Sequence, residues 1–323
     1  MSAPSPSVAT SSSSSATTIM MTHKERLNFF GNKVVMVTGA SEGLGLHCVQ
    51  HLFEMGCHII LACRSQSKTL RVMENIRSKS SNKYAMMEFL PLDLSDLNSV
   101  RNCAKLFLEK GIPLHALVCN AGVWLNDYCE TKQGLEMTYG VNHLGHFLLV
   151  NLLLGKLKES APSRVVIVSS MAHKYGNITQ LLNWAKSKDE AKQQFSTQQT
   201  YSNSKLANVL FAYGLARRLN ENAQKPQSDV SVVAVHPGVV NTKLFDNLWG
   251  GFVSVLGSLF FESPEHASLA LVYHAVHPQI AGLTGMKYFS QWKEQQSLKE
   301  TYEQKYQDEL WEISTQQVGG LNM

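Results

Sequence analysis

The chain has 323 residues, with 29 Lys and Arg against 25 Asp and Glu, so its formal net charge is +4. Hydrophobic residues make up 44% of the chain and charged residues 17%. This composition is typical of a globular protein and excludes collagen, a coiled coil and disorder along the full length. The small net charge argues against a nucleic-acid partner. The six cysteines form no C-x-x-C pair, which indicates a reducing compartment without disulfides or a zinc site.

The N-terminal segment, residues 1–30, is rich in Ser, Thr and Ala and predicts a disordered tail. It lacks the basic and apolar regions of a secretory signal, and residues 1–22 contain no Arg, which a transit peptide usually has. No apolar run reaches the roughly 18 residues that a membrane-spanning helix needs. We therefore expect an intracellular and most simply cytoplasmic protein, with peripheral contact with an internal membrane as an alternative.

After the tail, short apolar runs alternate with helical patterns, which predicts βαβ units and an α/β fold. The expected strands are Lys33–Thr38, His58–Ala62, Ala85–Leu90, Ala116–Cys119, Arg164–Val168 and Val230–Val235. The expected helices are Gly43–Met55, Gln66–Ser80, Leu97–Glu109, Gly134–Leu157 and Ser204–Asn220. The alternation is continuous and shows no internal repeat. We predict one domain over residues 31–323, a single Rossmann-type, doubly wound parallel sheet with helices on both faces.

Three segments leave alternatives open. The polar stretch Thr179–Gln199 is an insertion or a lid, and the apolar stretch Leu244–Phe261 is a substrate lid, a membrane-contacting element or core. The helix from Tyr201 carries an apolar stripe that could be core or the face of a homodimer, of which core is the commoner case.

A glycine-rich turn, Thr38-Gly39-Ala40-Ser41-Glu42-Gly43-Leu44-Gly45, follows the first strand and opens a helix. This is the context of a dinucleotide fingerprint. Gly39 permits the tight turn, Gly43 lets the backbone approach a pyrophosphate, and Gly45 allows helix and strand to pack closely. The free N–H groups of the helix then face the anion. We predict Thr38, Ser41 and Leu44 as further cofactor-binding residues, while Glu42 opposes an anion unless it points away.

The second strand ends at Cys63-Arg64, where an NAD enzyme would place an acidic residue for the ribose 2′-hydroxyl. A guanidinium instead suits a 2′-phosphate, because it donates two parallel hydrogen bonds. We therefore expect NADP(H) in preference to NAD(H). The alternative is that Arg64 is an ordinary solvated charge.

Tyr201 and Lys205 are four residues apart and share one face of a helix. A free Tyr has a pKa near 10, and a nearby ammonium is expected to lower it toward neutrality. Such a pair suits the protonation of an alkoxide as hydride arrives, or the reverse. A strand that ends in Ser169-Ser170 supplies a hydroxyl that can hold a substrate oxygen beside Tyr201.

With these motifs the sequence resembles the short-chain dehydrogenase/reductase family, whose fingerprint is T-G-x-x-x-G-x-G followed by Y-x-x-x-K. The resemblance covers about Lys33 to Phe289. Within the family it is most similar to the retinol dehydrogenase and WW-domain oxidoreductase group, without a WW module. The similarity is carried by Leu61-Ala62-Cys63-Arg64, Val141-Asn142-His143-Leu144-Gly145-His146-Phe147, Ser204-Lys205-Leu206-Ala207-Asn208 and Ala234-Val235-His236-Pro237-Gly238.

The resemblance implies roles for further residues. Asp93, with Leu94, would contact the adenine, although Asp93 could instead belong to a turn or a helix N-cap, a role that Ser95 could also take. Cofactor contacts are also implied for Asn120, Ala121, Gly122, Pro237, Gly238 and Thr242, the last of which would hold the nicotinamide carboxamide. Asn142 would fix a water in a proton relay with Lys205. Ser170 would orient the substrate, with Ser169 as the alternative.

The function implied is NADP(H)-linked interconversion of a lipophilic alcohol, such as a retinoid or steroid, with its aldehyde or ketone. The alternative from another class is an NADP-binding regulatory or scaffold protein with weak activity. A protochlorophyllide-reductase-like enzyme ranks lower. No metal is expected, because His146, His173 and His236 lack a carboxylate or Cys partner at ligand spacing.

Overall fold

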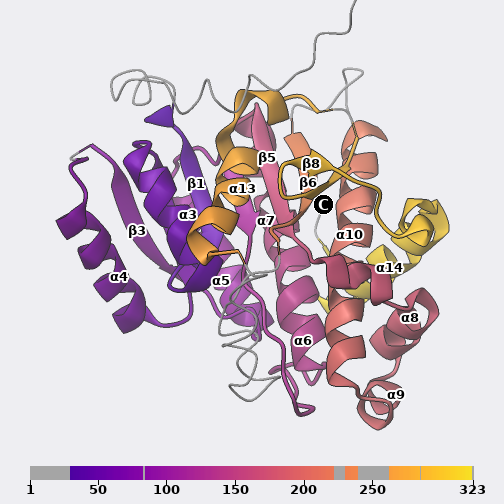
Figure 1. The fold of residues 1–323 in the computed structure, drawn as a ribbon. Helices are drawn as coiled ribbons and strands as arrows, with labels where there is room; N and C mark the ends of the chain where they lie inside the picture. The colour runs from indigo at the N-terminus through magenta and orange to yellow at the C-terminus, as the bar shows by residue number, and fades with distance from the viewer. Residues whose placement is uncertain (1–29, 83, 222–229, 239–261, 284, 322–323) are drawn as a thin grey trace, which may run out of the picture.

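The computed structural model describes residues 30–82, 84–221, 230–238, 262–283 and 285–321 (Figure 1). The predicted tail lies outside these ranges except for Phe30, which is 1% exposed and packs into the core. The assignment of Phe30 to a disordered tail was therefore wrong. Thr242 and the apolar stretch Leu244–Phe261 also lie outside the described residues.

A single sheet with the strand order β3-β2-β1-β4-β5-β6-β7-β8 forms the centre of the molecule. Its strands are β1 Val34–Thr38, β2 His58–Cys63, β3 Met86–Pro91, β4 Ala116–Cys119, β5 Ser163–Val168, β6 Val230–His236, β7 Lys287–Ser290 and β8 Lys293–Glu294. All neighbouring pairs are parallel except β7 and β8. The order reverses between β1 and β4, the topological switch point at which ligands bind in open α/β sheets.

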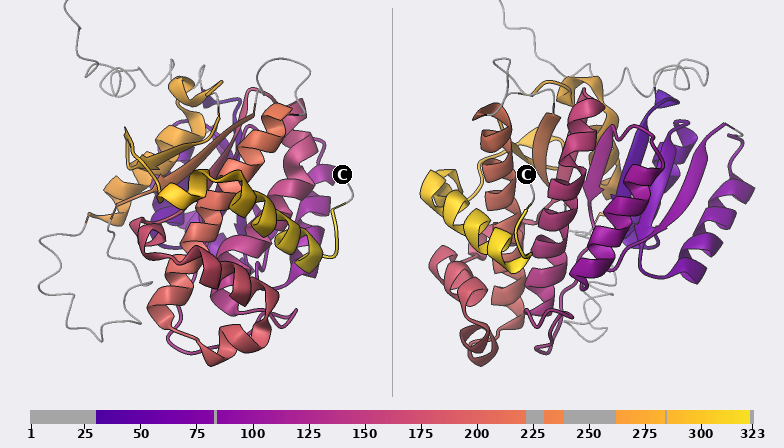
Figure 2. Two further views of the ribbon diagram at one scale, coloured as in Figure 1. Left: turned by 90° about the vertical axis from the view of Figure 1, so that its right-hand side faces the viewer. Right: turned by 180° about the vertical axis from the view of Figure 1, so that it is seen from behind.

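The central strands β1, β4, β5 and β6 are rich in Val, Ile, Leu and Ala, and every one of their residues is buried. Such continuous apolar runs are typical of parallel strands, because helices cover both faces of the sheet. One face packs against α5 Leu97–Glu109, α7 Gly145–Glu159 and α10 Thr197–Glu221. The other face packs against α3 Gly43–Glu54, α4 Gln66–Lys79 and α13 Pro264–Val276. Figure 2 shows the two helical layers from the side and from behind. The doubly wound parallel sheet is confirmed.

Two predicted helices differ in their bounds. The segment expected as one helix over Gly134–Leu157 is α6 Met137–Tyr139, a π-helical turn η1 Gly140–Leu144, and α7. A π-turn of this kind frequently marks a functional site, and it contains Asn142. The helix expected from Ser204 begins at Thr197, so that Tyr201 lies within its second turn. The apolar stripe of α10 is core, because Leu206, Val209 and Leu210 are all fully buried.

The polar stretch Thr179–Gln199 forms regular structure, α8 Ile178–Lys186 and α9 Lys188–Gln193, followed by the start of α10. Its few apolar residues lie on one face of α8, where Leu181 and Leu182 join the core beneath α10 and α14. This stretch is therefore a packed layer of the fold in this structure and not an open lid.

The C-terminal elements were not predicted. They comprise α13, β7, β8, the short 3₁₀ turns Pro278–Ile280 and Lys299–Tyr302, and α14 Gln304–Gln317. Trp311 of α14 packs on Phe147 of α7, with ring centroids 5.0 Å apart, and under the guanidinium of Arg218 at 4.2 Å. These contacts fasten α14 across α7 and α10, on the outer side of the helical layer (Figure 2).

Candidate active site

The predicted site residues gather at the carboxyl ends of β1, β4, β5 and β6. Thr38 ends β1, Asn120 follows β4, Ser170 follows β5 and Pro237 follows β6. Tyr201 and Lys205 on α10, and Asn142 in the π-turn, approach the same edge. The parallel direction of the strands brings these distant segments together, because all their carboxyl ends meet at one edge.

The turn after β1 is shaped for close approach. Gly39 and Gly43 have φ values of +65° and +52°, which side chains other than Gly rarely adopt. A Cβ at Gly45 would lie 2.4 Å from the carbonyl oxygen of Gly39 and 2.6 Å from Nδ2 of Asn120. The first turn of α3 contains no acidic residue, and no side chain caps its N–H groups. This turn is therefore able to receive an anionic group.

Thr38 and Asn120 fasten the two strand ends on either side of the switch point. The backbone N–H groups of Asn120 and Ala121 each donate to Oγ1 of Thr38 at 2.9 Å. The side-chain amide of Asn120 donates to the carbonyl oxygen of Thr38, also at 2.9 Å. The T-G and N-A-G motifs are thus two halves of one hydrogen-bonded unit.

Arg64 is exposed at the end of β2, immediately before Ser65, which caps α4. Glu42, whose negative charge would disfavour an anion at this turn, forms an ion pair with Lys68 of α4 at 2.5 Å. Its charge is thereby balanced. Among the described residues Arg64 forms no ion pair, which leaves its guanidinium available to a ligand.

Asp93 sits in a turn and does not cap α5. Its Oδ1 accepts from the backbone N–H of Ser95 at 3.0 Å and from the Ser95 hydroxyl at 2.6 Å, while Asp96 is the N-cap of α5. Leu94 points its side chain into the core against Gly145. A cofactor contact of Leu94 would therefore use its backbone.

Tyr201 is 5% exposed and Ser170 is half-buried beside it. Burial raises the pKa of Tyr201 to about 12, while a hydrogen bond from the Ser170 side chain acts to lower it. The expectation that the pKa of Tyr201 is lowered toward neutrality was wrong for this structure, because burial raises it. Ser169 is turned away, since its hydroxyl donates to the backbone oxygen of Lys205 at 2.9 Å. Of the two serines, the structure brings Ser170 to Tyr201.

Lys205 is 4% exposed, and its Nζ lies 5.5 Å from the centroid of the Tyr201 ring. The ammonium donates to the carbonyl oxygen of Val168, at the end of β5, at 3.2 Å. Burial lowers its pKa to about 8. A Cβ at Gly122 would lie 3.6 Å from this Nζ and 3.2 Å from Oδ1 of Asn142, so the N-A-G turn, Lys205 and Asn142 are neighbours.

Asn142 is fully buried and braces the loop that follows N-A-G. Its Oδ1 accepts from the backbone N–H of Val123 at 2.7 Å, and its Nδ2 donates to the Val123 carbonyl and to the Ser204 hydroxyl, each at 3.0 Å. The side chain thus joins this loop to α10, while the backbone oxygen of Asn142 lies 3.1 Å from Nδ1 of His146.

Two residues at this site are not predicted by the sequence motifs. Trp124 stacks on Tyr201, and Nε2 of His146 lies 2.8 Å from Oγ1 of Thr38. The position of Trp124, directly after the sequence N-A-G-V, is a feature of the sequence that could have indicated its place at the site. No local pattern predicts a role for His146, both of whose ring nitrogens are engaged in hydrogen bonds.

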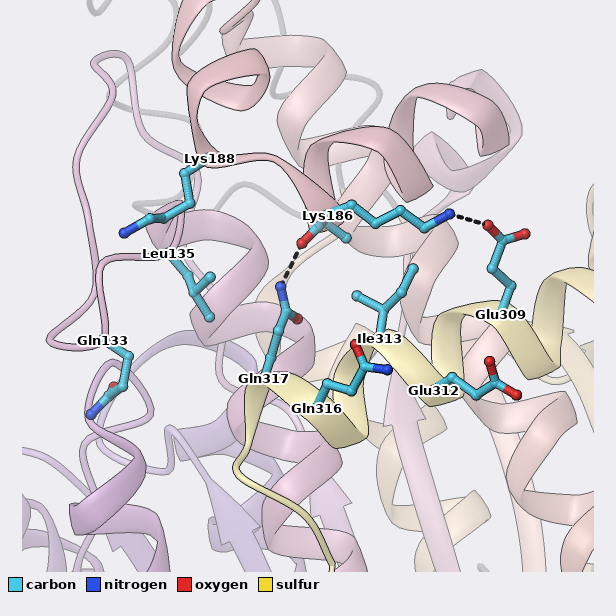
Figure 3. A pocket seen from close by; sticks show the side chains of 10 residues that line it. Gln133, Leu135, Lys186, Lys188, Glu309, Glu312, Ile313, Gln316 and Gln317 are labelled. Atoms are coloured by element: carbon cyan, nitrogen blue, oxygen red, sulfur yellow. Dashed lines mark hydrogen bonds and ion pairs between the residues drawn. The ribbon is translucent and has the colours of Figure 1, made fainter.

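A groove with a volume of about 660 Å³ lies elsewhere, between α8, α14 and the loop at Gln133 (Figure 3). An ion pair of Lys186 with Glu309 at 2.5 Å borders it, and Leu135 and Ile313 supply apolar walls. The groove shares no lining residue with the predicted site. The edge of the sheet where the predicted residues gather, not this groove, is the candidate active site.

The fold and the site together define a dinucleotide-binding α/β protein with a Ser–Tyr–Lys constellation at its switch point. The model of the short chain dehydrogenase family matches residues 33–188. Human polyprenol dehydrogenase is 38% identical over 299 residues, which cover 90% of this chain and 87% of the relative. Mouse retinol dehydrogenase 14 is 36% identical over 303 residues, covering 90% and 86%.

Among solved structures, an uncharacterised protein from Mycobacterium paratuberculosis superposes with a TM-score of 0.69 at 29% identity, covering 91% of this chain and 96% of that one. The chain belongs to the short-chain dehydrogenase family and is an oxidoreductase that acts on alcohols. The resemblance to the retinol dehydrogenase group is confirmed. No helix within the described ranges combines the length and apolar character needed to cross a bilayer.

Proposed function

We propose that this protein interconverts a lipophilic alcohol and its aldehyde or ketone, with NADP(H) as the cofactor and Tyr201 as the acid and base. The observation that carries the proposal is the convergence of Ser170, Tyr201 and Lys205 beside the N-A-G turn. Three segments far apart in the sequence supply a hydroxyl, a phenol and an ammonium to one spot.

The residues at the strand ends fit a dinucleotide. Gly39, Gly43 and Gly45 have no side chains to cover the uncapped N-terminus of α3. A pyrophosphate could therefore lie against its free N–H groups. Arg64 stands where a 2′-phosphate would be bound, and Asp93 and Gly122 would line the adenine and nicotinamide ends. When bound, NADP(H) supplies or accepts the hydride of the reaction.

Tyr201 holds the proton that the reaction requires. Because its pKa is raised to about 12, the phenol is protonated at neutral pH. It is therefore ready to donate its Oη proton to the oxygen of a carbonyl as that oxygen gains negative charge. In the reverse direction the phenolate takes the proton from the alcohol, and this step requires the nearby ammonium of Lys205 to stabilise it.

Ser170 and Lys205 arrange this proton transfer. The Ser170 hydroxyl lies at Tyr201 and can donate a second hydrogen bond to the same substrate oxygen. The Lys205 ammonium, anchored on the Val168 carbonyl, lies on the side of the N-A-G turn and Asn142. From there it can return a proton to the tyrosine through a water between Lys205 and Asn142.

The lipophilic substrate class has two supports. Met171 follows Ser170 directly and Tyr175 ends the same short 3₁₀ turn, and they are 46% and 73% exposed, which places apolar surface next to Ser170. The two relatives described above are called polyprenol dehydrogenase and retinol dehydrogenase 14.

The test is NADPH oxidation with retinal, steroid ketones and aliphatic aldehydes as substrates. We expect turnover of at least one class, and Tyr201→Phe should abolish it while NADPH binding, measured by cofactor fluorescence, is retained. Tyr84→Phe, at a tyrosine that is 75% exposed, is the matched control and should behave as wild type. Tight NADPH binding without turnover of any carbonyl would instead favour a regulatory protein, and an active Tyr201→Phe variant would refute the mechanism.

A further inference from the structure

The ring of Tyr201 is covered on one face by the indole of Trp124. The two ring centroids are 4.2 Å apart and the planes differ by 5°, a parallel stack at close contact. Trp124 comes from the loop that follows the N-A-G turn, whereas Tyr201 belongs to α10. The phenol thus has a defined partner on its face in addition to Ser170 at its hydroxyl.

The indole is itself held in place by α10. Its Nε1–H donates to the backbone oxygen of Thr197, 2.9 Å away, and Thr197 is the first residue of α10, one turn before Tyr201. The Thr197 hydroxyl in turn donates to the backbone oxygen of Asn126 at 3.1 Å. Loop and helix are therefore joined by two hydrogen bonds with the stacked rings between them.

We propose that Trp124 is a positioning residue for Tyr201: its indole fixes the plane of the phenol and shields that face from water, so that the hydroxyl points to the substrate oxygen. The proposal rests on the function proposed above. A tyrosine has rotational freedom about the bond to its ring, and a hydrogen bond at Oη alone does not fix the ring plane. The indole supplies this second constraint, and a proton donor must be oriented for efficient transfer.

The shielding has a separate, measurable consequence. Burial is what raises the pKa of Tyr201, and Trp124 covers one of the two faces that would otherwise be hydrated. The charged group beside the ring is Lys205, and Ser170 supplies the hydrogen bond; neither belongs to the Trp124 loop. Removing the indole should therefore return the pKa of Tyr201 toward the ordinary value near 10.

Four variants separate the contributions. Trp124→Leu removes the aromatic face, and Trp124→Phe keeps an aromatic face but loses the donor to Thr197. Thr197→Ala removes the Asn126 anchor of the same loop and leaves both rings in place. Trp292→Leu is the matched control. This tryptophan is 40% exposed, and its ring packs against Tyr273 and not against Tyr201.

Three quantities are measured for each variant: kcat and KM with the best carbonyl substrate, the Kd of NADPH, and the ionisation of Tyr201. The ionisation of Tyr201 is followed by the ultraviolet absorbance of tyrosinate as the pH is raised. The titration curve of the same protein with Tyr201→Phe is subtracted, so that only Tyr201 remains. For Trp124→Leu we expect kcat to fall on the order of tenfold, the Kd of NADPH to stay within about twofold, and Tyr201 to titrate at lower pH. Trp124→Phe should lie between Trp124→Leu and wild type, and Trp292→Leu should match wild type.

An unchanged kcat and an unchanged Tyr201 titration in Trp124→Leu would overturn the proposal. So would a Thr197→Ala variant that reproduces both changes, because loop anchoring alone would then explain them. If Trp124→Leu does not fold, the same comparison is made with Trp124→Phe. The titration needs no turnover, so an inactive wild-type protein would refute the proposed function while the contact between Trp124 and Tyr201 is still tested.

Discussion

The hydroxyl of Thr38 lies 2.8 Å from Nε2 of His146, and the other ring nitrogen of this histidine, Nδ1, lies 3.1 Å from the backbone oxygen of Asn142. A carbonyl oxygen only accepts, so Nδ1 carries the hydrogen and Nε2 accepts from the Thr38 hydroxyl. Burial lowers the pKa of His146 to about 4, which keeps the ring neutral at neutral pH, as this pattern requires. With its proton given to His146, Oγ1 of Thr38 has both lone pairs free for the N–H groups of Asn120 and Ala121.

Replacing Thr38 by Val should therefore weaken both stability and cofactor binding. The variant removes the acceptor of the Ala121 N–H and one of the two acceptors of the Asn120 N–H, which also donates to the Val118 carbonyl at 3.0 Å. It also leaves Nε2 of His146 without its donor. We expect the free energy of unfolding, measured with urea, to fall by about 1–3 kcal/mol, and the Kd of NADPH to rise. Thr38→Ser keeps the hydroxyl and is the control. Equal values for Thr38→Val and Thr38→Ser would contradict the network.

The sequence was sufficient to predict the nucleotide-binding half of the fold. The strands from β1 to β6 are largely apolar runs bounded by turns, and their bounds agree with the prediction to within one residue. Two features were not readable in this way. The two-residue β8 is exposed and has no apolar run, and α8 sits within a stretch whose overall polarity conceals its one apolar face.

For the site, sequence motifs identified residues but not their surroundings. The four-residue spacing of Tyr201 and Lys205 placed both on α10, whereas the burial that raises one pKa and lowers the other depends on the tertiary packing. The link between Thr38 and His146 spans 108 positions, and no local pattern announces it. Contacts of this kind follow from sheet order and strand register, which single-sequence patterns do not specify.

Arg64→Asp should change the cofactor preference. The guanidinium follows β2 in an exposed position, where a carboxylate would repel a 2′-phosphate and accept from a ribose 2′-hydroxyl. We expect the ratio of kcat/KM for NADPH to that for NADH to fall by at least about tenfold, since a charge-assisted hydrogen bond contributes about 1.5–3 kcal/mol. Arg71→Asp, also exposed and on α4, carries the same charge change and should leave the ratio near that of wild type. An unaltered ratio in Arg64→Asp would remove Arg64 from the cofactor site.

Lys205→Met should abolish turnover and yet stabilise the fold at neutral pH. Burial lowers the pKa of Lys205 from 10.5 to about 8, so at pH 7 the folded protein carries a charge that the buried site disfavours. Between pH 8 and 10.5 the unfolded chain binds a proton that the folded protein does not, and the stability of wild type gains with pH. The excess stability of Lys205→Met should therefore be largest below pH 8 and shrink as the pH approaches 10.5, as measured by urea unfolding.

The exposed Lys105→Met, at a side chain that is 74% exposed, is the control for Lys205→Met. Its difference from wild type should show no comparable dependence on pH over the same range. A Lys205→Met variant that is less stable than wild type at pH 7 would mean that the hydrogen bond to the Val168 carbonyl outweighs the burial of the charge.

Five buried histidines predict a steep loss of stability in mild acid. Burial lowers the pKa of each from 6.5, to about 3 for His143 and to about 4 for His146, His173, His236 and His274. Between pH 6.5 and 4 the unfolded chain binds protons that the folded protein excludes, so the stability these groups provide is complete above pH 6.5 and is lost as the pH falls. We expect the free energy of unfolding to fall by more per pH unit than the roughly 1.4 kcal/mol that one group can supply.

His143→Asn should make this dependence less steep, because one buried group no longer takes up a proton on unfolding. Its Nε2 lies 2.9 Å from Oγ of Ser314, so the variant also loosens α14, and the slope with pH, not the absolute stability, is the quantity to compare. His266→Asn, at a side chain that is 60% exposed, serves as the control. A free energy of unfolding that stays constant from pH 7 to 5 in wild type would show that these rings are hydrated in solution and would remove the basis for a neutral His146 beside Thr38.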